Sequence, residues 1–350
     1  MRVLVTGNEG YIGSILLPLL LDGGHEVFGM DTGLFRECAI GAVTRPPTLR
    51  KDVRDVERQD VEGYDAVIHL AGLANDPLGD LDPPLTYEIN HEAAVRTAEL
   101  AKQAGVPRFL FASSCSVYGA GGEDMIDEDT PPGPLTAYAR SKVLAEADLL
   151  RLADAAFCPV LLRAATAYGV SPYLRFDLAV NNLVAWAYTT HRVHLKSDGM
   201  SWRPLVHVQD IASGYLALLE APRALVHARA FNVGSTDENY RIRELAELVR
   251  QGVPGSRLEY AKDASPDHRS YRVSCDRIGR TLPGFRTRWT VRAGIEEVYR
   301  AVRAARLAAE DFEGARYNRI AHVRRLMTQG RVGSDLRWQE RQIALAGAAS

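Results

Sequence analysis

The stretch Thr6-Gly7-Asn8-Glu9-Gly10-Tyr11-Ile12-Gly13 decides the fold, because it places glycines at positions 7, 10 and 13. The apolar run Arg2-Val3-Leu4-Val5-Thr6 predicts a short buried strand that leads into it, and Tyr11 to Asp22 predicts the helix that follows. Glycines at such a junction permit a tight turn and let backbone N–H groups approach a pyrophosphate, to which the helix N-terminus adds positive potential. The stretch is therefore typical of a dinucleotide-binding unit.

An acidic residue follows at the spacing that this unit requires. Val27-Phe28-Gly29-Met30 predicts a second strand, and Asp31 comes directly after it, about twenty residues beyond the glycines. A carboxylate there can hold the ribose diol of an adenosine, and its charge repels the 2′-phosphate of NADP. The sequence therefore favours NAD, while the nearby Arg36 keeps NADP as an alternative.

Apolar runs and helical patterns continue to alternate toward the middle of the chain. Residues 65–70, 108–113 and 159–163 predict strands, and an amphipathic helix from about Leu85 to Gln103 lies between the first two. Strands that read as continuous apolar runs imply a parallel sheet covered by helices on both faces. We therefore predict an α/β fold, a doubly wound parallel (Rossmann) sheet with a smaller C-terminal substrate-binding lobe.

The second half of the chain is less regular, and its patterns define the expected domains. Helices are predicted at 176–190, 211–219 and 243–251, strands at 203–208 and 231–233, and a helical, arginine-rich run at 291–329. We expect residues 1–165 to form the NAD-binding Rossmann domain with 204–235 returning to it, 166–203 and 236–300 to form the substrate lobe, and 301–350 to form a helical C-terminal extension. The basic run is interpreted as a solvated face paired with nearby acidic residues such as Glu296 and Glu310, with a subunit contact or a clamp over a phosphate ligand as alternatives.

Composition narrows the class of protein. With 42 basic and 44 acidic side chains and a formal net charge of -2, the 350-residue chain gives no sign of a nucleic-acid or membrane partner. Its four cysteines (Cys38, Cys115, Cys158 and Cys275) form no CxxC pair, which is typical of reduced thiols in a cytoplasmic protein. The apolar residues Ile12 to Leu21 imitate a signal peptide, but no small-x-small cleavage site follows, so we do not expect secretion.

A metal site is not predicted. The pair of histidines in His191-Arg192-Val193-His194 has no accompanying carboxylate or cysteine cluster, and zinc needs three or four ligands. We interpret this stretch as a polar strand end.

Tyr138 and Lys142 lie one helical turn apart in Tyr138-Ala139-Arg140-Ser141-Lys142, downstream of Ser113-Ser114-Cys115-Ser116-Val117-Tyr118-Gly119. A tyrosine is a poor base at its reference pKa of about 10, but a neighbouring ammonium favours the phenolate. We expect the lysine and a positive nicotinamide ring to lower the pKa of the tyrosine by about three units, which corresponds to about 4 kcal/mol. The pair then forms a proton relay that operates near neutral pH.

Together with His69-Leu70-Ala71-Gly72, these motifs make the chain resemble the extended short-chain dehydrogenase/reductases, and within them the nucleotide-sugar epimerases and dehydratases. The resemblance runs from Met1 to about Glu297. It implies NAD as cofactor, a nucleotide sugar as small-molecule substrate, and a homodimer joined through two helices per subunit, here 85–103 and 136–153.

The resemblance also implies roles for individual residues. The residues expected around NAD are Gly7, Gly10, Tyr11, Ile12 and Gly13 at the pyrophosphate, Asp31 at the ribose, Asp52 and Val53 at the adenine, Leu70, Ala71 and Gly72 at the nicotinamide half, and Asn90 nearby. Tyr138 is the expected base, Lys142 its electrostatic partner and a ligand of the nicotinamide ribose, and Ser114 the partner of the reacting hydroxyl. The substrate residues expected are Ser116, Thr166, Asn182, Arg203 and Arg272, of which the arginines suit a diphosphate.

Departures from the family pattern favour one reaction. Dehydratases of the family carry an Asp-Glu pair where this chain has Cys115-Ser116, so elimination of water lacks an evident acid or base. Thr166 stands where many relatives have an asparagine, which leaves the sugar open. We predict an NAD-dependent epimerase that transiently oxidises a hydroxyl, at C4, with an NAD(P)-dependent keto-sugar reductase as the main alternative. A 4,6-dehydratase and a non-catalytic dinucleotide-binding protein are further alternatives.

Overall fold

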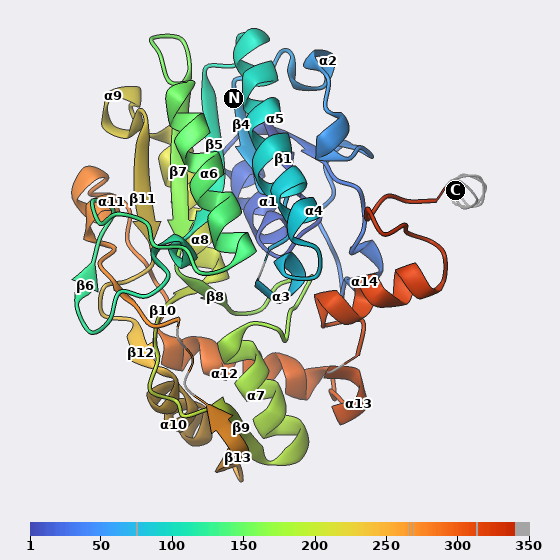
Figure 1. The fold of residues 1–350 in the computed structure, drawn as a ribbon, viewed down its shortest axis with the longest axis vertical. Coiled ribbons are helices and arrows are strands. Elements are labelled where there is room, and N and C mark those ends of the chain that lie inside the picture. Colours follow the sequence, from blue (N-terminus) through green and yellow to red (C-terminus); the bar gives the residue numbers. More distant parts are fainter. Residues whose placement is uncertain (75, 266, 268, 313, 340–350) are drawn as a thin grey trace.

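A computed structural model describes residues 1–339 except 75, 266, 268 and 313. Its central sheet has seven parallel strands in the order β11-β7-β5-β4-β1-β2-β3 (Figure 1). These strands are β1 (Arg2–Thr6), β2 (Glu26–Met30), β3 (Thr48–Leu49), β4 (Ala66–His69), β5 (Arg108–Ser114), β7 (Cys158–Ala164) and β11 (Arg229–Val233). The order reverses between β1 and β4, and ligands bind beyond the carboxyl ends of the strands at such a switch point. The predicted doubly wound parallel fold is confirmed.

Helices cover both faces of this sheet because successive strand residues point to opposite sides. Val3 and Val5 of β1 pack in the apolar cluster that includes α1 (Gly13–Asp22) and α8 (Val208–Glu220). Leu4 packs in the opposite cluster, with helices from the second quarter of the chain. These helices are α4 (Pro83–Tyr87), a π-helical turn at Glu88–Glu92, α5 (Ala93–Gln103) and α6 (Ala137–Arg151). Shorter helical segments are η1 (Arg36–Cys38), η2 (Val53–Asp55), α2 (Arg58–Val61), α3 (Asp76–Gly79), η4 (Cys115–Tyr118) and α9 (Arg223–Val226).

A second lobe lies beyond the carboxyl ends of the strands (Figure 1). A third apolar cluster forms its core between α7 (Ala179–Thr190), α10 (Ile242–Gly252) and α12 (Val291–Ala304). Its small sheets pair β9 (Arg192–Ser197) with β13 (Arg257–Ser265), β10 (Trp202–His207) with both β8 (Thr166–Tyr168) and β12 (Asn239–Arg241), and β6 (Met125–Ile126) with β14 (Arg272–Val273). A short helix, α11 (Asp276–Thr281), follows β14.

The stretch expected to return to the Rossmann domain, 204–235, is divided. Its α8 contacts α1 and its β11 forms one edge of the seven-stranded sheet. Its β10 instead pairs with β8, which continues the chain from β7 after a break at Ala165, and so extends into the second lobe.

The predicted helical run 291–329 is not one continuous helix. It is divided into α12, α13 (Ala309–Phe312) and α14 (Arg319–Thr328). Arg306 adopts a left-handed φ of 49°, which ends the first helix, and Leu307 and Phe312 are buried in the core of the second lobe. Residues 340–350 of the expected extension lie outside the described residues.

Three arginines of this extension form ion pairs with the Rossmann domain. Arg325 and Arg331 both form ion pairs with Glu37, and Arg337 forms one with Asp55. Of these three, only Arg325 belongs to the basic run 291–329, and for it the expected pairing with Glu296 or Glu310 is wrong.

Among the described residues, no helix combines the length and the apolar character needed to cross a membrane. In the same residues no group of three histidine, cysteine or acidic side chains is arranged to hold a metal ion. His191 ends α7 in a left-handed conformation, and His194 lies in β9 with its ring 5.3 Å from that of Trp186. The two histidines thus lie at the start of a strand, as the sequence predicted.

Candidate active site

One cavity of about 1150 Å³ extends from the glycine turn after β1 to the second lobe. Most of the residues expected to bind cofactor or substrate line it: Gly7, Gly10, Tyr11, Ile12, Gly13, Asp31, Asp52, Val53, Leu70, Ala71, Gly72, Ser114, Ser116, Tyr138, Lys142, Thr166, Asn182 and Arg203. Asn90 and Arg272 are not among its lining residues. The topology therefore brings both sets of predicted residues to one site.

The glycine turn requires glycine for steric reasons. Gly7 has a φ of 70°, and a Cβ there would lie 2.6 Å from the backbone nitrogen of Ala71. A Cβ on Gly13 would lie 2.6 Å from the carbonyl oxygen of Asn8. The turn thus packs tightly against the loop after β4, and its three glycines line the cavity at the N-terminus of α1, where a pyrophosphate can approach the backbone.

Asp31 follows β2 and is fixed by two backbone donors. The N–H of Glu9 donates to its Oδ2 at 3.0 Å, and the N–H of Gly33 donates to its Oδ1 at 2.8 Å. Burial raises the pKa of this carboxyl, while the two hydrogen bonds oppose the shift. A second acid lies beside it, because the Glu9 side chain is only 2% exposed and pairs with Arg50 at 2.6 Å.

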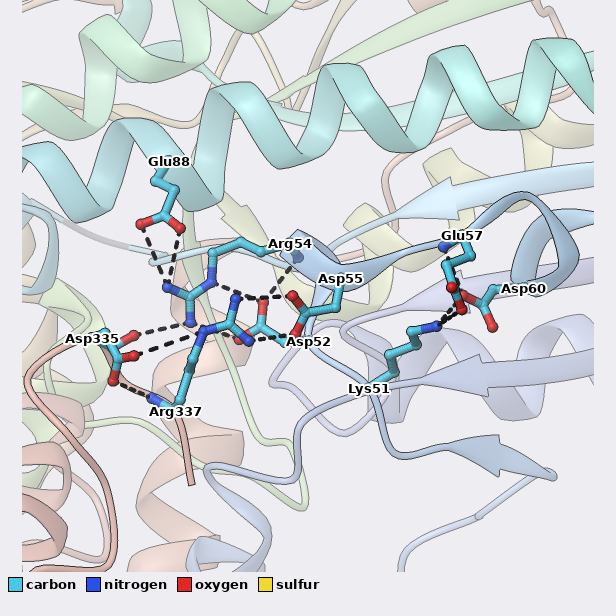
Figure 2. Close-up of polar contacts among 9 residues, drawn as sticks. All are labelled: Lys51, Asp52, Arg54, Asp55, Glu57, Asp60, Glu88, Asp335 and Arg337. Carbon is cyan, nitrogen blue, oxygen red and sulfur yellow. Dashed lines mark hydrogen bonds and ion pairs between the residues drawn. The ribbon is translucent and has the colours of Figure 1, made fainter. Parts of the chain in front are cut away.

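The expected adenine end of the cavity is ordered by a cluster of charges (Figure 2). Arg54 donates to both carboxylate oxygens of Asp52, at 3.0 and 2.7 Å. Burial raises the pKa of Asp52, but these hydrogen bonds outweigh it, so the pKa lies below its usual value. Arg54 also donates to the carbonyl oxygen of Asp335, so the C-terminal segment contacts this end of the cavity.

Tyr138 lies in the first turn of α6, whose N-terminus is capped by Thr136. The Lys142 ammonium lies 5.8 Å from the centre of the tyrosine ring and 4.7 Å from that of Phe111. Burial raises the pKa of Tyr138 to about 12, although a hydrogen bond with Ser114 lowers it. Burial also lowers the pKa of Lys142 to about 8.

The expected depression of the tyrosine pKa is therefore not produced by this chain alone. Desolvation disfavours both the phenolate and the ammonium, and it exceeds the opposing effects of the Ser114 hydrogen bond on the tyrosine and of the Glu146 charge on the lysine. Ser114, Tyr138 and Lys142 nevertheless lie together on the cavity wall.

A buried ion pair anchors α6 to the sheet beneath these residues. Glu146, one turn after Lys142, pairs with Arg163 of β7 at 2.6 Å and accepts a hydrogen bond from Ser113. Arg163 donates in turn to the hydroxyl of Tyr118 at 2.9 Å. This network holds the ends of β5 and β7 against the helix that carries Tyr138.

On the side of the second lobe, Arg203 is held within the cavity wall. It pairs with Asp267 at 2.6 Å and donates to the carbonyl oxygens of Trp202 and Arg269. Arg269 itself lines the cavity and pairs with Asp76 of α3 at 2.6 Å. This ion pair links the two lobes across the site.

Two of the predicted residues have other places. Arg272 lies on β14 with its guanidinium 4.7 Å from the ring centre of Trp202, and it donates to the carbonyl oxygen of Glu123. Arg269 thus lines the cavity, whereas the predicted Arg272 does not. Asn90 exchanges hydrogen bonds with the N–H and C=O of Leu73, which fixes the loop after β4 from behind.

The sequence from residue 3 to residue 234 matches the model of the NAD dependent epimerase/dehydratase family. The chain belongs to this family. It is 30% identical to the UDP-glucose 4-epimerase of Corynebacterium glutamicum over 271 residues, which are 72% of this chain and 80% of that one. Among solved structures, MoeE5 in complex with UDP-glucose and NAD has a TM-score of 0.75 at 27% identity, with 88% of this chain and 100% of that chain covered. The UDP-glucose 4-epimerase of Thermus thermophilus in complex with NAD has a TM-score of 0.71 at 25% identity, with 87% and 100% covered.

The residues of this epimerase/dehydratase chain fit the family's cofactor, NAD. The glycines of the turn line the cavity at the N-terminus of α1, which suits a pyrophosphate, and Asp31 offers carboxylate oxygens to a ribose diol. Lys142 lies beside the loop after β4, since a Cβ on Gly72 would be 3.7 Å from its Nζ. When bound, NAD would accept and return a hydride, and its positive charge in this cavity would favour the Tyr138 phenolate that the chain alone disfavours.

The positions of the dehydratase acid pair carry no carboxyl group in this member of the family. Cys115 is buried and donates to the carbonyl oxygen of Arg163 at 3.3 Å. Ser116 lines the cavity, and its buried hydroxyl has no hydrogen-bond partner among the described residues. This free hydroxyl suits a substrate oxygen better than proton transfer to carbon.

Sequence reasoning missed several residues of the cavity wall. They are Glu9, Asp76, Arg175, Asp177, Arg269, Arg319 and Leu336. Arg175 forms an ion pair with Asp177 at 2.8 Å just before α7, and the charged triplet Arg175-Phe176-Asp177 ahead of an apolar helix was an available signal. Arg319 belongs to the basic run, for which a clamp over a phosphate ligand was one alternative, whereas Leu336 carried no signal.

Proposed function

We propose that this protein is an NAD-dependent epimerase of a nucleotide-activated sugar that oxidises one hydroxyl to a ketone, at C4, and then returns the hydride. The observation that carries the proposal is the arrangement of Ser114, Tyr138 and Lys142 on the wall of a cavity that the glycine turn also lines. The curated and structural relatives named 4-epimerase support the choice of carbon.

In the proposed reaction the chain moves one proton. Tyr138, as phenolate, removes the proton of the sugar hydroxyl while hydride leaves the same carbon, and Ser114 shares the proton through its hydrogen bond with the tyrosine. Lys142 stabilises the phenolate by its charge. The ketone then turns within the cavity and receives the hydride on its other face, so no second substrate is consumed.

The nucleotide diphosphate of the substrate would lie on the side of the second lobe. Asn182 donates its Nδ2 to the carbonyl oxygen of Phe176 at 2.7 Å, which leaves its Oδ1 for the ligand. Arg203 and Arg269 offer planar guanidinium groups that suit phosphate oxygens. We propose these three residues as the diphosphate site, with Thr166 and Ser116 nearer the sugar.

The nearest alternative is a keto-sugar reductase that uses the same three residues and exchanges its cofactor. Incubation with UDP-glucose distinguishes the two reactions, because an epimerase forms UDP-galactose with no net absorbance change at 340 nm. Stoichiometric formation of NADH would instead support the reductase. A 4,6-dehydratase is disfavoured because Cys115 and Ser116 offer no carboxyl group.

Tyr138→Phe tests the assigned base. General base catalysis is worth about 10²–10⁴-fold, so the variant should retain NAD and lose turnover by at least about a hundredfold. Tyr260→Phe is the matched control, since this tyrosine is half exposed and is not among the cavity-lining residues. Turnover of Tyr138→Phe at the level of the control would contradict the proposal.

We also propose that two subunits associate through α5 and α6. Leu144 and Leu150 of α6 are exposed apolar side chains, as a subunit interface on this helix requires. Light scattering of the full chain should give the mass of a dimer. Leu144→Asp should shift the measured mass toward that of a monomer. All four cysteines are free and buried, which agrees with the predicted cytoplasmic location.

A further inference from the structure

The segment after α14 returns to the Rossmann domain and is fixed there by several polar contacts (Figure 2). Arg54 donates to the carbonyl oxygen of Asp335 at 2.9 Å, and Arg337 donates to the Asp55 carboxylate at 3.0 Å. The indole of Trp338 donates to the carbonyl oxygen of Thr32 at 2.8 Å. The three partners from the Rossmann domain follow β2 and β3, where the adenosine of a dinucleotide is held in this fold.

Leu336 is the residue that this segment turns toward the site. It lines the same cavity as Asp31 and Val53, and it is buried in the apolar cluster that contains Leu34 and Val53. Its φ of 61° is left-handed, a conformation that is unfavourable for a leucine. Such strain in a non-glycine residue persists only where its surroundings fix it, and it concentrates at binding sites.

Arg319, the first residue of α14, brings a buried positive charge to the same cavity, near the carboxylate of Asp177. It is 4% exposed, with its guanidinium 4.4 Å from the ring centre of Phe35 and one donor bonded to the carbonyl oxygen of Tyr173 at 3.2 Å. Its Nη1 has no hydrogen-bond partner among the described residues, and burial lowers the pKa of the group to about 10. The unpartnered Nη1 of this buried guanidinium can therefore donate to an anionic ligand in the cavity.

We propose that the C-terminal segment from Arg319 to Trp338 completes the dinucleotide site, with Leu336 covering the adenosine and Arg319 binding a phosphate of the pyrophosphate. The segment lies outside the part of the chain that matches the family model, which ends at residue 234. The inference rests on NAD binding and not on the proposed sugar reaction.

The C-terminal segment presents an apolar side chain, Leu336, to the cavity and is held in place by charged residues. An adenine offers a flat apolar face, so a leucine fixed against it by surrounding ion pairs contributes affinity without ordering a free loop on binding. A dinucleotide covered in this way dissociates slowly. Slow release suits a reaction in which the cofactor is regenerated at each turnover.

ADP-ribose is the probe, because it has the adenosine and pyrophosphate of NAD and takes part in no hydride transfer. Titration calorimetry on the full chain freed of nucleotide should show that Leu336→Ala lowers the affinities for ADP-ribose and for NAD by the same factor. We expect about tenfold for a lost apolar contact of this size. Met327→Ala is the matched control, since Met327 packs against the same apolar cluster and is not among the residues lining the cavity. Affinity for ADP-ribose within twofold of wild type, or an equal loss in the control, would overturn the proposal.

Arg319→Gln tests the phosphate contact, with Arg324→Gln, on the exposed side of α14, as its control. The Arg319 variant should bind ADP-ribose about tenfold or more weakly, because a charge-assisted hydrogen bond is lost, and it should bind adenosine as well as wild type does. If Arg319→Gln lowered the affinity for UDP and not the affinity for ADP-ribose, this arginine would belong to the substrate site and the proposal would fail. Absence of epimerase activity would leave these binding results unaffected.

Discussion

The Glu9 carboxylate accepts two hydrogen bonds of 2.6 Å from the Arg50 guanidinium, inside the glycine turn that is expected to bind the cofactor. The backbone of the same glutamate donates to Asp31, so two carboxylates lie together where the adenosine ribose is expected. One of them neutralises an arginine that would otherwise attract a 2′-phosphate.

Glu9→Gln should therefore relax the discrimination between NAD and NADP. Without the carboxylate, Arg50 is free to pair with the 2′-phosphate, and we expect NADP to bind at least about tenfold more tightly, a change of about 1.4 kcal/mol. Calorimetric titration of both dinucleotides measures the ratio. Glu26→Gln, at an exposed ion pair with Arg2, is the control. An unchanged ratio of the two affinities in Glu9→Gln would show that Asp31 alone sets the preference.

A comparison of Gly7→Ala with Gly24→Ala should separate the effect of a Cβ on the shape of the glycine turn from the effect of a left-handed backbone. A Cβ at Gly7 would lie 2.6 Å from the nitrogen of Ala71, whereas Gly24, at a similar φ of 76°, has nothing within 4 Å. Each alanine should cost about 1–2 kcal/mol of folding free energy for its left-handed backbone, and Gly7→Ala should cost more because its Cβ also meets the Ala71 backbone. Only Gly7→Ala should also lose NAD affinity, by about thirtyfold for one charge-assisted hydrogen bond. NAD titration and urea unfolding of both variants provide the comparison, and equal NAD affinity in the two would contradict it.

The Rossmann part of the fold could be predicted because its signals are local. Arg2–Thr6, the glycines and Asp31 lie within about thirty residues, and each reports on a strand, a turn or a strand end by its own composition. Lys142 follows Tyr138 by one helical turn, so their shared face could also be predicted. The sequence spacing did not reveal how strongly burial would act, and burial reverses the expected shift of the tyrosine pKa.

The remaining site residues depend on contacts between distant segments. Arg269 and Arg272 are three residues apart, and only the irregular path into β14 decides which of them contacts the cavity. Arg319 and Leu336 meet Phe35 and Val53 across almost the whole chain. Such contacts are set by packing, which composition and periodicity do not determine.

Lys142→Met should show a stability difference that depends on pH. The pKa of Lys142 is about 8 in the folded protein against 10.5 ordinarily, so between these values the unfolded chain binds the extra proton. Raising the pH through this window therefore stabilises wild type, whereas the variant has no lysine at this position to titrate. From pH 7 to pH 9.5 we expect wild type to gain about 2 kcal/mol relative to the variant.

Urea unfolding at the two pH values measures this difference, because the other titrating groups are common to both proteins. Lys102→Met, at a partly exposed ion pair with Asp154, is the control. A difference between Lys142→Met and wild type that stays constant with pH would show that the ammonium is well solvated in the folded protein. Turnover of the variant should be lost at both pH values, since Lys142 is the cation beside Tyr138.

Glu146→Leu should cost about 3–5 kcal/mol of folding free energy, because it leaves the Arg163 guanidinium buried without its partner. The double variant Glu146→Leu/Arg163→Leu should recover much of this loss, since removal of both charges also removes their desolvation cost. Glu247→Ala breaks an ion pair of the same 2.6 Å on the surface, with Arg250, and should cost far less because both groups stay in water. Urea unfolding of wild type and the three variants measures these free energies. Because both ion pairs have the same N–O distance, the difference between them reports the effect of burial. If Glu146→Leu cost no more than Glu247→Ala, water would have to reach Arg163, and the network beneath Tyr138 would not be the rigid support that its burial implies.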